Sequence, residues 1–359
     1  MTLDQSRTAV LGRALRFAGL RPIAESLGTI VLGLIAGAGL MLIFGSNPIA
    51  AYSALFTGAF GTVADALETL AFATPLMLTA LTFAVGVRAG LFNIGAEGQM
   101  FMGAIGATFV AGLIPLPAGI HLVAATGAGL LAGGAWALLP ALLKVWRGVH
   151  EVISTIMANW IALFLATYLA VNFLSEPGRA ERTTPALETA RYPVLNEDAS
   201  LTAVFFVAIT FCVLVYFYLW GTRAGYGIRL AGENPEAARY AGVSARRAIF
   251  LSFIIGGFAA GLAGASQIIG RPPAWSLNAT MGNVVTIGFD GIGVALVGRN
   301  HPIGGIAAAI LFGALQQGGR LMEYQAGVAS DLVRAINGLI VITMAVPEIW
   351  SLLRRRRAR

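Results

Sequence analysis

The long apolar runs of this sequence limit its fold more than any other feature. Residues 27–44 and 201–220 are predominantly apolar over their whole length, and about 18 such residues suffice for a helix to cross a bilayer. The chain is 57% hydrophobic and only 11% charged, which indicates that lipid rather than water surrounds most of it. Because a helix satisfies its own backbone hydrogen bonds in hydrocarbon, we expect an all-α fold.

We predict a polytopic integral membrane helical bundle of about ten transmembrane segments, some of them short or broken. Two segments, 283–298 and 303–318, are short and interrupted by glycine, a pattern typical of discontinuous helices around a translocation path. A short helix is also expected near residues 50–58. The ten predicted segments are 27–44, 67–87, 99–114, 120–143, 152–174, 201–220, 248–270, 283–298, 303–318 and 332–350.

The basic residues are distributed unevenly between the two sides of the predicted bundle. With the N-terminus in the cytoplasm, 18 of the 24 Lys and Arg residues fall in inner connections. The positive-inside rule then predicts a multi-pass protein of the inner (plasma) membrane with both termini cytoplasmic. The net charge of +7 is therefore attributed to topology and not to nucleic-acid binding. The predicted parts are a cytoplasmic leader (1–26), a membrane domain (27–350) with an external loop (172–200) and a cytoplasmic loop (221–247), and a basic cytoplasmic tail (351–359).

The cytoplasmic loop contains the stretch GENPEAARYAG, residues 232–242. Asn234 is a good helix N-cap, Pro235 suits the first helical position, and Glu236 favours the positive end of the helix dipole. A short helix outside the membrane is therefore expected. Its alanines are small enough to enter a groove of another protein, and its charged residues are suited to contacts at the rim. A surface helix that only links two spans is an equal alternative.

Four stretches of the sequence resemble a known family. Residues 236–242, EAARYAG, resemble the EAA-x-x-x-G loop of ATP-binding-cassette importer permeases, although the family's later Ile and Leu-Pro positions are not reproduced after Gly242. GLFNIGAEGQMFMGA (90–104), HEVISTIMANWIA (150–162) and GFDGIGVALVGRNHPIGG (288–305) resemble the ten-span permeases of ribose, branched-chain amino acid and nucleoside importers. HEVISTIMANWIA and the 172–200 loop are most similar to the basic-membrane-protein type nucleoside branch.

The resemblance implies that this chain is the permease subunit of an importer for nucleosides or related simple sugars, and not an enzyme. The implied partners are an ABC ATPase subunit, a second permease that is a paralogue, a substrate-binding lipoprotein and membrane lipid. The chain has no G-x-x-x-x-G-K-[ST] loop, so ATP and Mg²⁺ are expected on the ATPase and no cofactor on this chain. The residues expected to couple to the ATPase are Glu233, Asn234, Glu236, Ala237, Ala238, Arg239 and Gly242.

Polar residues at helical spacing are the candidates for the substrate path. Glu151, Thr155 and Asn159 recur at intervals of four and share one helix face, and a similar stripe is expected from Asn283, Thr286 and Asp290. Neutral amides and hydroxyls suit a hydroxyl-rich solute that must be released again. Hydrogen bonding between helices is the alternative for each of these residues. Asp290 is expected either to pair with Arg334 or to face an aqueous cavity.

The stretch GLFNIGAEGQMF, residues 90–101, is interpreted as a structural turn on the inner face. Asn93 is suited to bonding its own backbone, Gly95 to a tight turn, and Glu97 to the first turn of the next helix, with a secondary possibility that Glu97 touches the ATPase or lines the inner exit. Gln99 completes the polar group.

Two other classes of function compete with the permease reading. In an ion-coupled secondary transporter, Asp290 and Glu97 would be ion sites, but such a carrier has no use for a docking helix. An integral membrane enzyme has no supporting residues, and no catalytic or metal site is predicted. The three histidines, His121, His150 and His301, form no ligand cluster and are expected in surface or interfacial roles.

Overall fold

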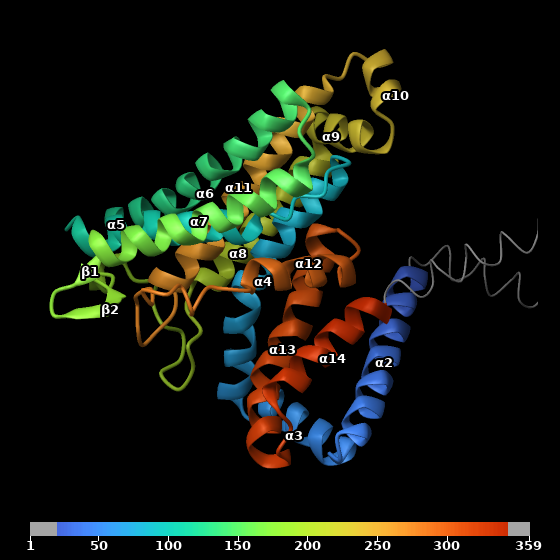
Figure 1. Cartoon of the computed structure of the whole chain (residues 1–359), viewed down its shortest axis with the longest axis vertical. Helices are drawn as coiled ribbons and strands as arrows, with labels where there is room; N and C mark the ends of the chain where they lie inside the picture. Colours follow the sequence, from blue (N-terminus) through green and yellow to red (C-terminus); the bar gives the residue numbers. More distant parts are fainter. Residues whose placement is uncertain (1–19, 344–359) are drawn as a thin grey trace, which may run out of the picture. The chain divides into compact units, whose positions relative to one another are not determined.

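The computed structural model describes residues 20–343, and this part is almost entirely helical (Figure 1). The predicted leader 1–26 is therefore described only from Leu20, and the predicted tail 351–359 lies outside the described residues. The helices are α2 (Leu20–Ile43), α3 (Pro48–Phe60), α4 (Val63–Arg88), α5 (Ala96–Leu113), α6 (Ile120–Arg147), α7 (Glu151–Asn172), α8 (Val204–Gly221), α9 (Arg223–Glu233), α10 (Pro235–Tyr240), α11 (Ala245–Ile269), α12 (Ile287–Val297), α13 (Pro302–Ala326) and α14 (Ser330–Thr343).

Each of the ten predicted segments overlaps one helix, so the prediction of a polytopic helical bundle is confirmed. Within the described residues, α4, α6, α7, α8 and α11 are long and apolar enough to cross a membrane. The pair α12 and α13, bent by 118° at the break, makes a sixth span if it is counted as one. This number is below the predicted ten: α12 and α13 count as one bent pair, and the described apolar part of α2 is short. The predicted short helix near 50–58 is α3.

The chain forms two compact units. The large unit comprises residues 55–320, and its centre is α11, which packs against α6, α5 and α4, with α7 against α5 and α12 against α4. Small residues allow the helix backbones to approach each other closely. A Cβ atom on Gly103 of α5 or on Gly133 of α6 would lie 2.4 Å from the Cα atom of Gly261 in α11. Three helices therefore meet at one glycine.

The small unit comprises residues 1–54 and 321–359, of which 20–54 and 321–343 are described. Its α2 and α14 pack on each other. A Cβ atom on Gly33 would lie 2.7 Å from the Cα atom of Ile340, and the Thr343 hydroxyl donates to the carbonyl of Thr29 at 2.8 Å. These contacts again follow the small-residue packing of membrane helices.

The predicted external loop is ordered and contains the hairpin β1 (Ser175–Glu176) and β2 (Arg179–Thr183), followed by the 3-10 turn η1 (Glu188–Ala190). A hydrogen bond from Arg182 lowers the pKa of the Glu176 carboxyl. His121 anchors the loop: its ring nitrogens bond Thr189 at 2.7 Å and the carbonyl of Val110 at 3.0 Å. His121 is completely buried, so the prediction of a surface or interfacial role is wrong for this histidine.

Candidate functional site

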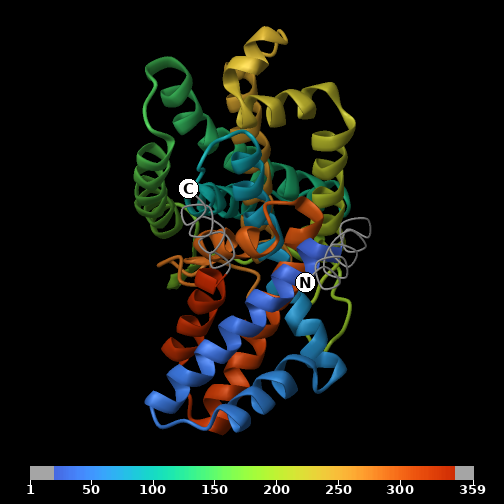
Figure 2. The same ribbon diagram turned by 90° about the vertical axis from the view of Figure 1, so that its right-hand side faces the viewer.

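The predicted helix in GENPEAARYAG is α10. The Asn234 side-chain oxygen accepts hydrogen bonds from the backbone N–H groups of Glu236 and Ala237, both at 3.0 Å, and Pro235 occupies the first helical turn. The N-cap prediction is therefore confirmed. In Figure 2 the gold helix α10 stands at one end of the large unit, beyond α9, which runs across the end of α8.

The exposed surface of α10 differs from the expectation at Ala238. Ala238 is completely buried in its own chain, and its carbonyl accepts the Val243 N–H at 2.8 Å. Ala238 therefore packs inward and cannot enter a partner's groove, because the helix must sit on α9 through one face. The outward side chains are those of Glu236, Ala237, Arg239 and Tyr240, with Glu233 and Gly242 also exposed. Tyr240, 88% exposed, was not predicted, although an aromatic residue among small ones is a visible signal.

The loop that carries α10 is fixed directly to the end of α4. A Cβ atom on Gly232 would lie 2.3 Å from the carbonyl oxygen of Arg88 and 2.7 Å from the backbone nitrogen of Gly90. Only glycine permits this approach. A displacement of α9 is therefore expected to act on α4 at once.

A cluster of four side chains, Arg88, Trp220, Arg229 and His301, connects the same loop to the break between α12 and α13. The Trp220 ring lies 5.5 Å from the guanidinium of Arg88 and 5.2 Å from that of Arg229, and 4.8 Å from the ring of His301. Arg88 Nε also donates to the carbonyl of Asn300 at 2.9 Å. This Trp220 cluster joins α4, α8, α9 and the turn before α13.

The polar turn before α5 is buried and not solvated. Asn93, Glu97 and Gln99 are only 1%, 3% and 1% exposed. The Asn93 side-chain oxygen accepts the N–H of Gly95 at 2.9 Å, which confirms that Asn93 bonds its own backbone. The Asn93 oxygen and the Glu97 carboxylate therefore reach protein backbone.

The Glu97 carboxylate caps a different helix from the one in which it lies. Its two oxygens accept the backbone N–H groups of Thr286 at 2.5 Å and Gly288 at 2.7 Å. These donors belong to the first turn of α12, where a carboxylate also favours the helix dipole. Gly288 permits the approach, since a Cβ atom there would lie 2.4 Å from the Glu97 nitrogen. Glu97 is thus a tie between α5 and α12.

The predicted stripe on α7 exists and faces this turn. The Asn159 amide accepts the N–H of Gly98 and donates to the carbonyl of Ile94, both at 2.9 Å. The Thr155 hydroxyl donates to the carbonyl of Glu151 at 2.7 Å, and the Glu151 carboxylate accepts from Lys144 at 2.6 Å. Glu151 and Asn159 therefore bond neighbouring elements, as the alternative expects, whereas Thr155 bonds its own helix. A role of the three residues in the substrate path stays a prediction.

The predicted stripe of Asn283, Thr286 and Asp290 is wrong. Helix α12 begins only at Ile287, and Thr286 has a left-handed backbone with φ of 76°. Asn283 lies in the preceding loop, where its amide donates to the carbonyl of Ser276 at 3.0 Å. The helix cannot start earlier because Thr286 turns its N–H toward Glu97. The three side chains therefore share no helix face.

The two charges proposed to pair are described in different units. Asp290 accepts a hydrogen bond from Gln316 at 3.4 Å in the large unit. Arg334 lies 3.6 Å from Asp331 in the small unit, and both side chains are largely exposed. The pairing of Asp290 with Arg334 stays a prediction.

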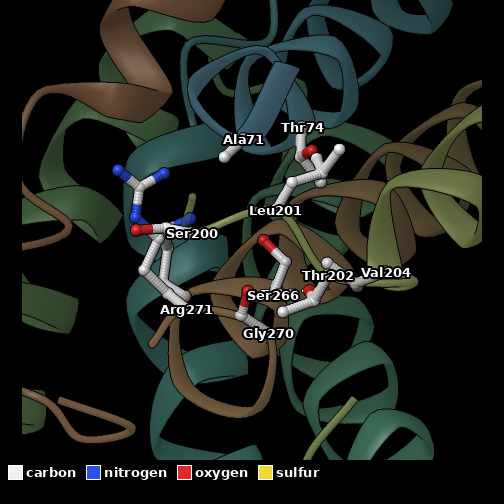
Figure 3. Close-up of a pocket in the computed structure, with 10 residues that line it drawn as sticks. Ala71, Thr74, Ser200, Leu201, Thr202, Val204, Ser266, Gly270 and Arg271 are labelled. Atoms are coloured by element: carbon white, nitrogen blue, oxygen red, sulfur yellow. Dashed lines mark hydrogen bonds between the residues drawn. The ribbon is translucent and has the colours of Figure 1, made fainter. Parts of the chain in front are cut away.

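The opposite end of α4 closes over a small polar pocket. Helix α4 has 26 residues, a length of about 39 Å, so this end is remote from α10. Figure 3 shows Thr74 of α4 and Ser266 of α11 around the pocket, together with Thr202, which lies in the segment before α8. Its volume is about 10 Å³, enough for about one water molecule.

Glu68 holds this end together. Its carboxylate accepts Arg271 Nη2 at 2.7 Å and the backbone N–H of Ser200 at 2.8 Å, which joins α4 to the segments after α11 and before α8. Burial lowers the pKa of Arg271, and Glu68 opposes this effect. Beside the contact lies an outward cavity of about 430 Å³ whose lining includes Asp65, Glu197 and Asp198. These two contacts, named the Glu68 latch, hold α4 to Ser200 and Arg271, which both line the pocket.

Comparison with known proteins identifies similar chains. A family model described as branched-chain amino acid transport system / permease component matches residues 65–345. The chain is 38% identical to the guanosine ABC transporter permease protein NupP of Bacillus subtilis, over 88% of this chain and 91% of that protein. It is 34% identical to the nucleoside ABC transporter permease protein NupB of Lactococcus lactis (93% of each chain).

A third relative is named for a sugar. The glucose ABC transporter permease protein TsgB13 of Haloferax volcanii is 31% identical over 90% of this chain and 87% of that protein. No solved structure matches the chain. These relatives match nearly the full length of the chain, including the turn before α5 and the loop that carries α10.

Proposed function

Because the chain belongs to the permease-component family of branched-chain amino acid transport systems, we propose that it imports nucleosides or related simple sugars. It is a multi-pass membrane permease subunit of an ATP-binding-cassette importer and not an enzyme; the ATPase is a separate subunit. The observation that carries the substrate class is the similarity to a guanosine permease over 88% of the chain. The glucose relative supports the inclusion of simple sugars.

The ion-coupled alternative has no support. Its proposed site at Glu97 is already engaged, because both carboxylate oxygens accept backbone N–H groups of α12. An ion or proton that bound there would have to displace these bonds.

The mechanism that we propose is alternating access driven at α10. ATP and Mg²⁺ bind the partner ATPase, whose closure pushes on the exposed face of α10. The α9–α10 loop transmits this push to α4 through Gly232 and to the α12–α13 break through the Trp220 cluster. At the far end, release of the Glu68 latch opens the pocket. Solute then passes toward the α10 end when the latch closes.

The orientation and the partners follow from the same proposal. The α10 end lies on the cytoplasmic side of the inner membrane, as the excess of inner basic residues favours, and both termini are cytoplasmic. The Glu68 end then faces a substrate-binding lipoprotein. A second permease, a paralogue as the nucleoside branch implies, completes the membrane channel with surrounding lipid.

A reconstituted assembly tests this function. Proteoliposomes with the permease pair, the ATPase and the lipoprotein are expected to accumulate a radiolabelled nucleoside only with ATP. Uptake that persists without ATP and disappears when ion gradients are dissipated would favour a secondary transporter. A panel of nucleosides and simple sugars, tested by competition, identifies the substrate.

A further inference from the structure

Two amide side chains at the α10 end of the large unit are buried with unused hydrogen-bonding capacity. Asn93 and Gln99 are each 1% exposed. In the described part of the chain, the Asn93 amide nitrogen and both polar atoms of Gln99 have no hydrogen-bond partner. Buried polar groups are nearly always bonded because an unpaired one loses its hydration without replacement. Buried polar atoms without a protein partner are suited to a ligand that binds transiently.

The two amides converge on one place. A Cβ atom on Gly95 would lie 2.9 Å from both the Asn93 oxygen and the Gln99 nitrogen. On the far side, a Cβ atom on Gly256 of α11 would lie 3.5 Å from the Asn93 nitrogen. The glycines leave room for the two amide side chains but provide no hydrogen-bond partner for their unused atoms. The unused Gln99 nitrogen therefore lies beside Gly95, and the unused Asn93 nitrogen lies toward Gly256 of α11.

A neighbouring amide shows that the local packing does not prevent satisfaction. Asn159 is 5% exposed and bonds the same turn through both of its polar atoms. Unlike Gln99, this buried amide has a hydrogen-bond partner at both its oxygen and its nitrogen. Gln99 therefore departs from the pattern of its surroundings, as functional side chains often do.

The turn that carries these amides is held by contacts that can separate. Glu97 ties it to α12 and Asn159 ties it to α7 through side-chain hydrogen bonds. Asn93 also lies against α4, since a Cβ atom on Gly86 would be 3.1 Å from the Asn93 Cβ atom. Helix α4 contacts the α9–α10 loop at this end through Gly232. A shift of α4 or α12 would uncover the two amides.

We propose that Asn93 and Gln99 form a transient binding site for the base edge of a nucleoside on its way to the cytoplasm, an inference that rests on the proposed function. A carboxamide presents one acceptor and one donor side by side, which matches the adjacent donor and acceptor of a nucleobase edge. Its neutral bonds are weak enough to release the solute. In the structure these amide atoms have no hydrogen-bond partner, so they are available to bind the next solute.

The test is Gln99→Leu in the complete reconstituted importer, with thermal stability and ATP-dependent nucleoside uptake measured on the same preparation. Leucine is similar in size and removes polar atoms that have no partner, so the melting temperature should stay or rise. Uptake at limiting substrate should fall about three- to tenfold, the value of one or two neutral hydrogen bonds. The matched control Asn159→Leu should lower the melting temperature, because it leaves the Gly98 N–H and Ile94 carbonyl unpaired.

Two results would overturn the proposal. A lower melting temperature of Gln99→Leu would show that the amide is bonded to a structural water, and unchanged uptake would show that no solute touches it. The wild-type importer separates this failure from the failure of the proposed function. If it accumulates nucleosides while the variant matches it, only the amide site is wrong; if it accumulates none, the nucleoside function is wrong as well.

Discussion

The turn at residues 93–99 and the loop at 233–242 are both short, glycine-containing and polar, and both were expected at the cytoplasmic face. In the structure, Asn93, Glu97 and Gln99 of the turn are at most 3% exposed; the Glu97 carboxylate bonds α12, and the backbone N–H of Gly98 bonds Asn159 of α7. The loop exposes most of its side chains, and its Asn234 side chain caps its own helix. The difference shows that polarity at a turn does not itself mark a docking surface. The exposed loop is suited to a partner, whereas the buried turn fixes the bundle.

The largest expected effect comes from Glu97→Ala. The substitution leaves the N–H groups of Thr286 and Gly288 without their acceptor. Gly288 is buried whereas Thr286 is exposed, and one unpaired buried donor costs about 1–3 kcal/mol, so the chain should lose roughly that much stability. We expect little folded protein after extraction, measured by size-exclusion chromatography and thermal unfolding.

The matched control replaces a glutamate in the exposed loop that carries α10. Glu236→Ala should leave unfolding unchanged, because the Glu236 side chain is exposed. Equal unfolding temperatures for Glu97→Ala and wild type would break the contrast between the two regions.

Trp220→Leu is expected to have an intermediate effect. It tests the Trp220 cluster, which connects the loop that carries α10 to the break between α12 and α13. It removes the ring that lies against both Arg88 and Arg229 but keeps an apolar side chain. Cation–π contacts at partly exposed sites are worth about 0.5–1 kcal/mol each, so the loss of both should lower solute uptake per ATP hydrolysed about five- to thirtyfold. Coupled uptake and phosphate release are measured in the same vesicles.

ATP hydrolysis itself should continue in this variant, because α10 remains in place. Phe56→Leu, an exposed aromatic outside the Trp220 cluster, serves as control and should leave the ratio unchanged. A normal ratio with Trp220→Leu would remove the cluster from the coupling route.

The smallest expected effect is that of Asn234→Ala. Loss of the N-cap costs about 1 kcal/mol, and it should be confined to α10 because Asn234 bonds only Glu236 and Ala237 in this helix. Amide hydrogen exchange of α10 should become about fivefold faster, as about 1 kcal/mol implies.

Asn196→Ala is the matched control for the cap. Asn196 accepts the Asp198 N–H at 2.8 Å in an exposed turn of another loop. Its substitution should leave exchange in α10 unchanged. Unchanged exchange in Asn234→Ala as well would mean that the loop is held by other contacts.

The success of sequence reasoning depended on the range of the interactions. The Asn234 cap and the Asn93 turn were predictable because the donor and the acceptor lie within three residues. The helices were predictable because apolar runs specify them locally. The stripe at Asn283, Thr286 and Asp290 failed because α12 starts where Glu97 binds it, 189 residues away from Thr286. Glu68 and Arg271 are 203 residues apart, and no local pattern identifies such a pair.

The central claim, that a separate ATPase drives this permease through the exposed face of α10, is tested most directly by Ala237→Trp. Ala237 is exposed on α10, whereas the buried Ala238 would disturb the fold itself. Ala180→Trp in the exposed β2 strand is the matched control. We predict that Ala237→Trp folds normally but loses ATP-dependent uptake and co-purification of the ATPase, while Ala180→Trp keeps both. Normal uptake and normal ATPase binding in Ala237→Trp would contradict the account.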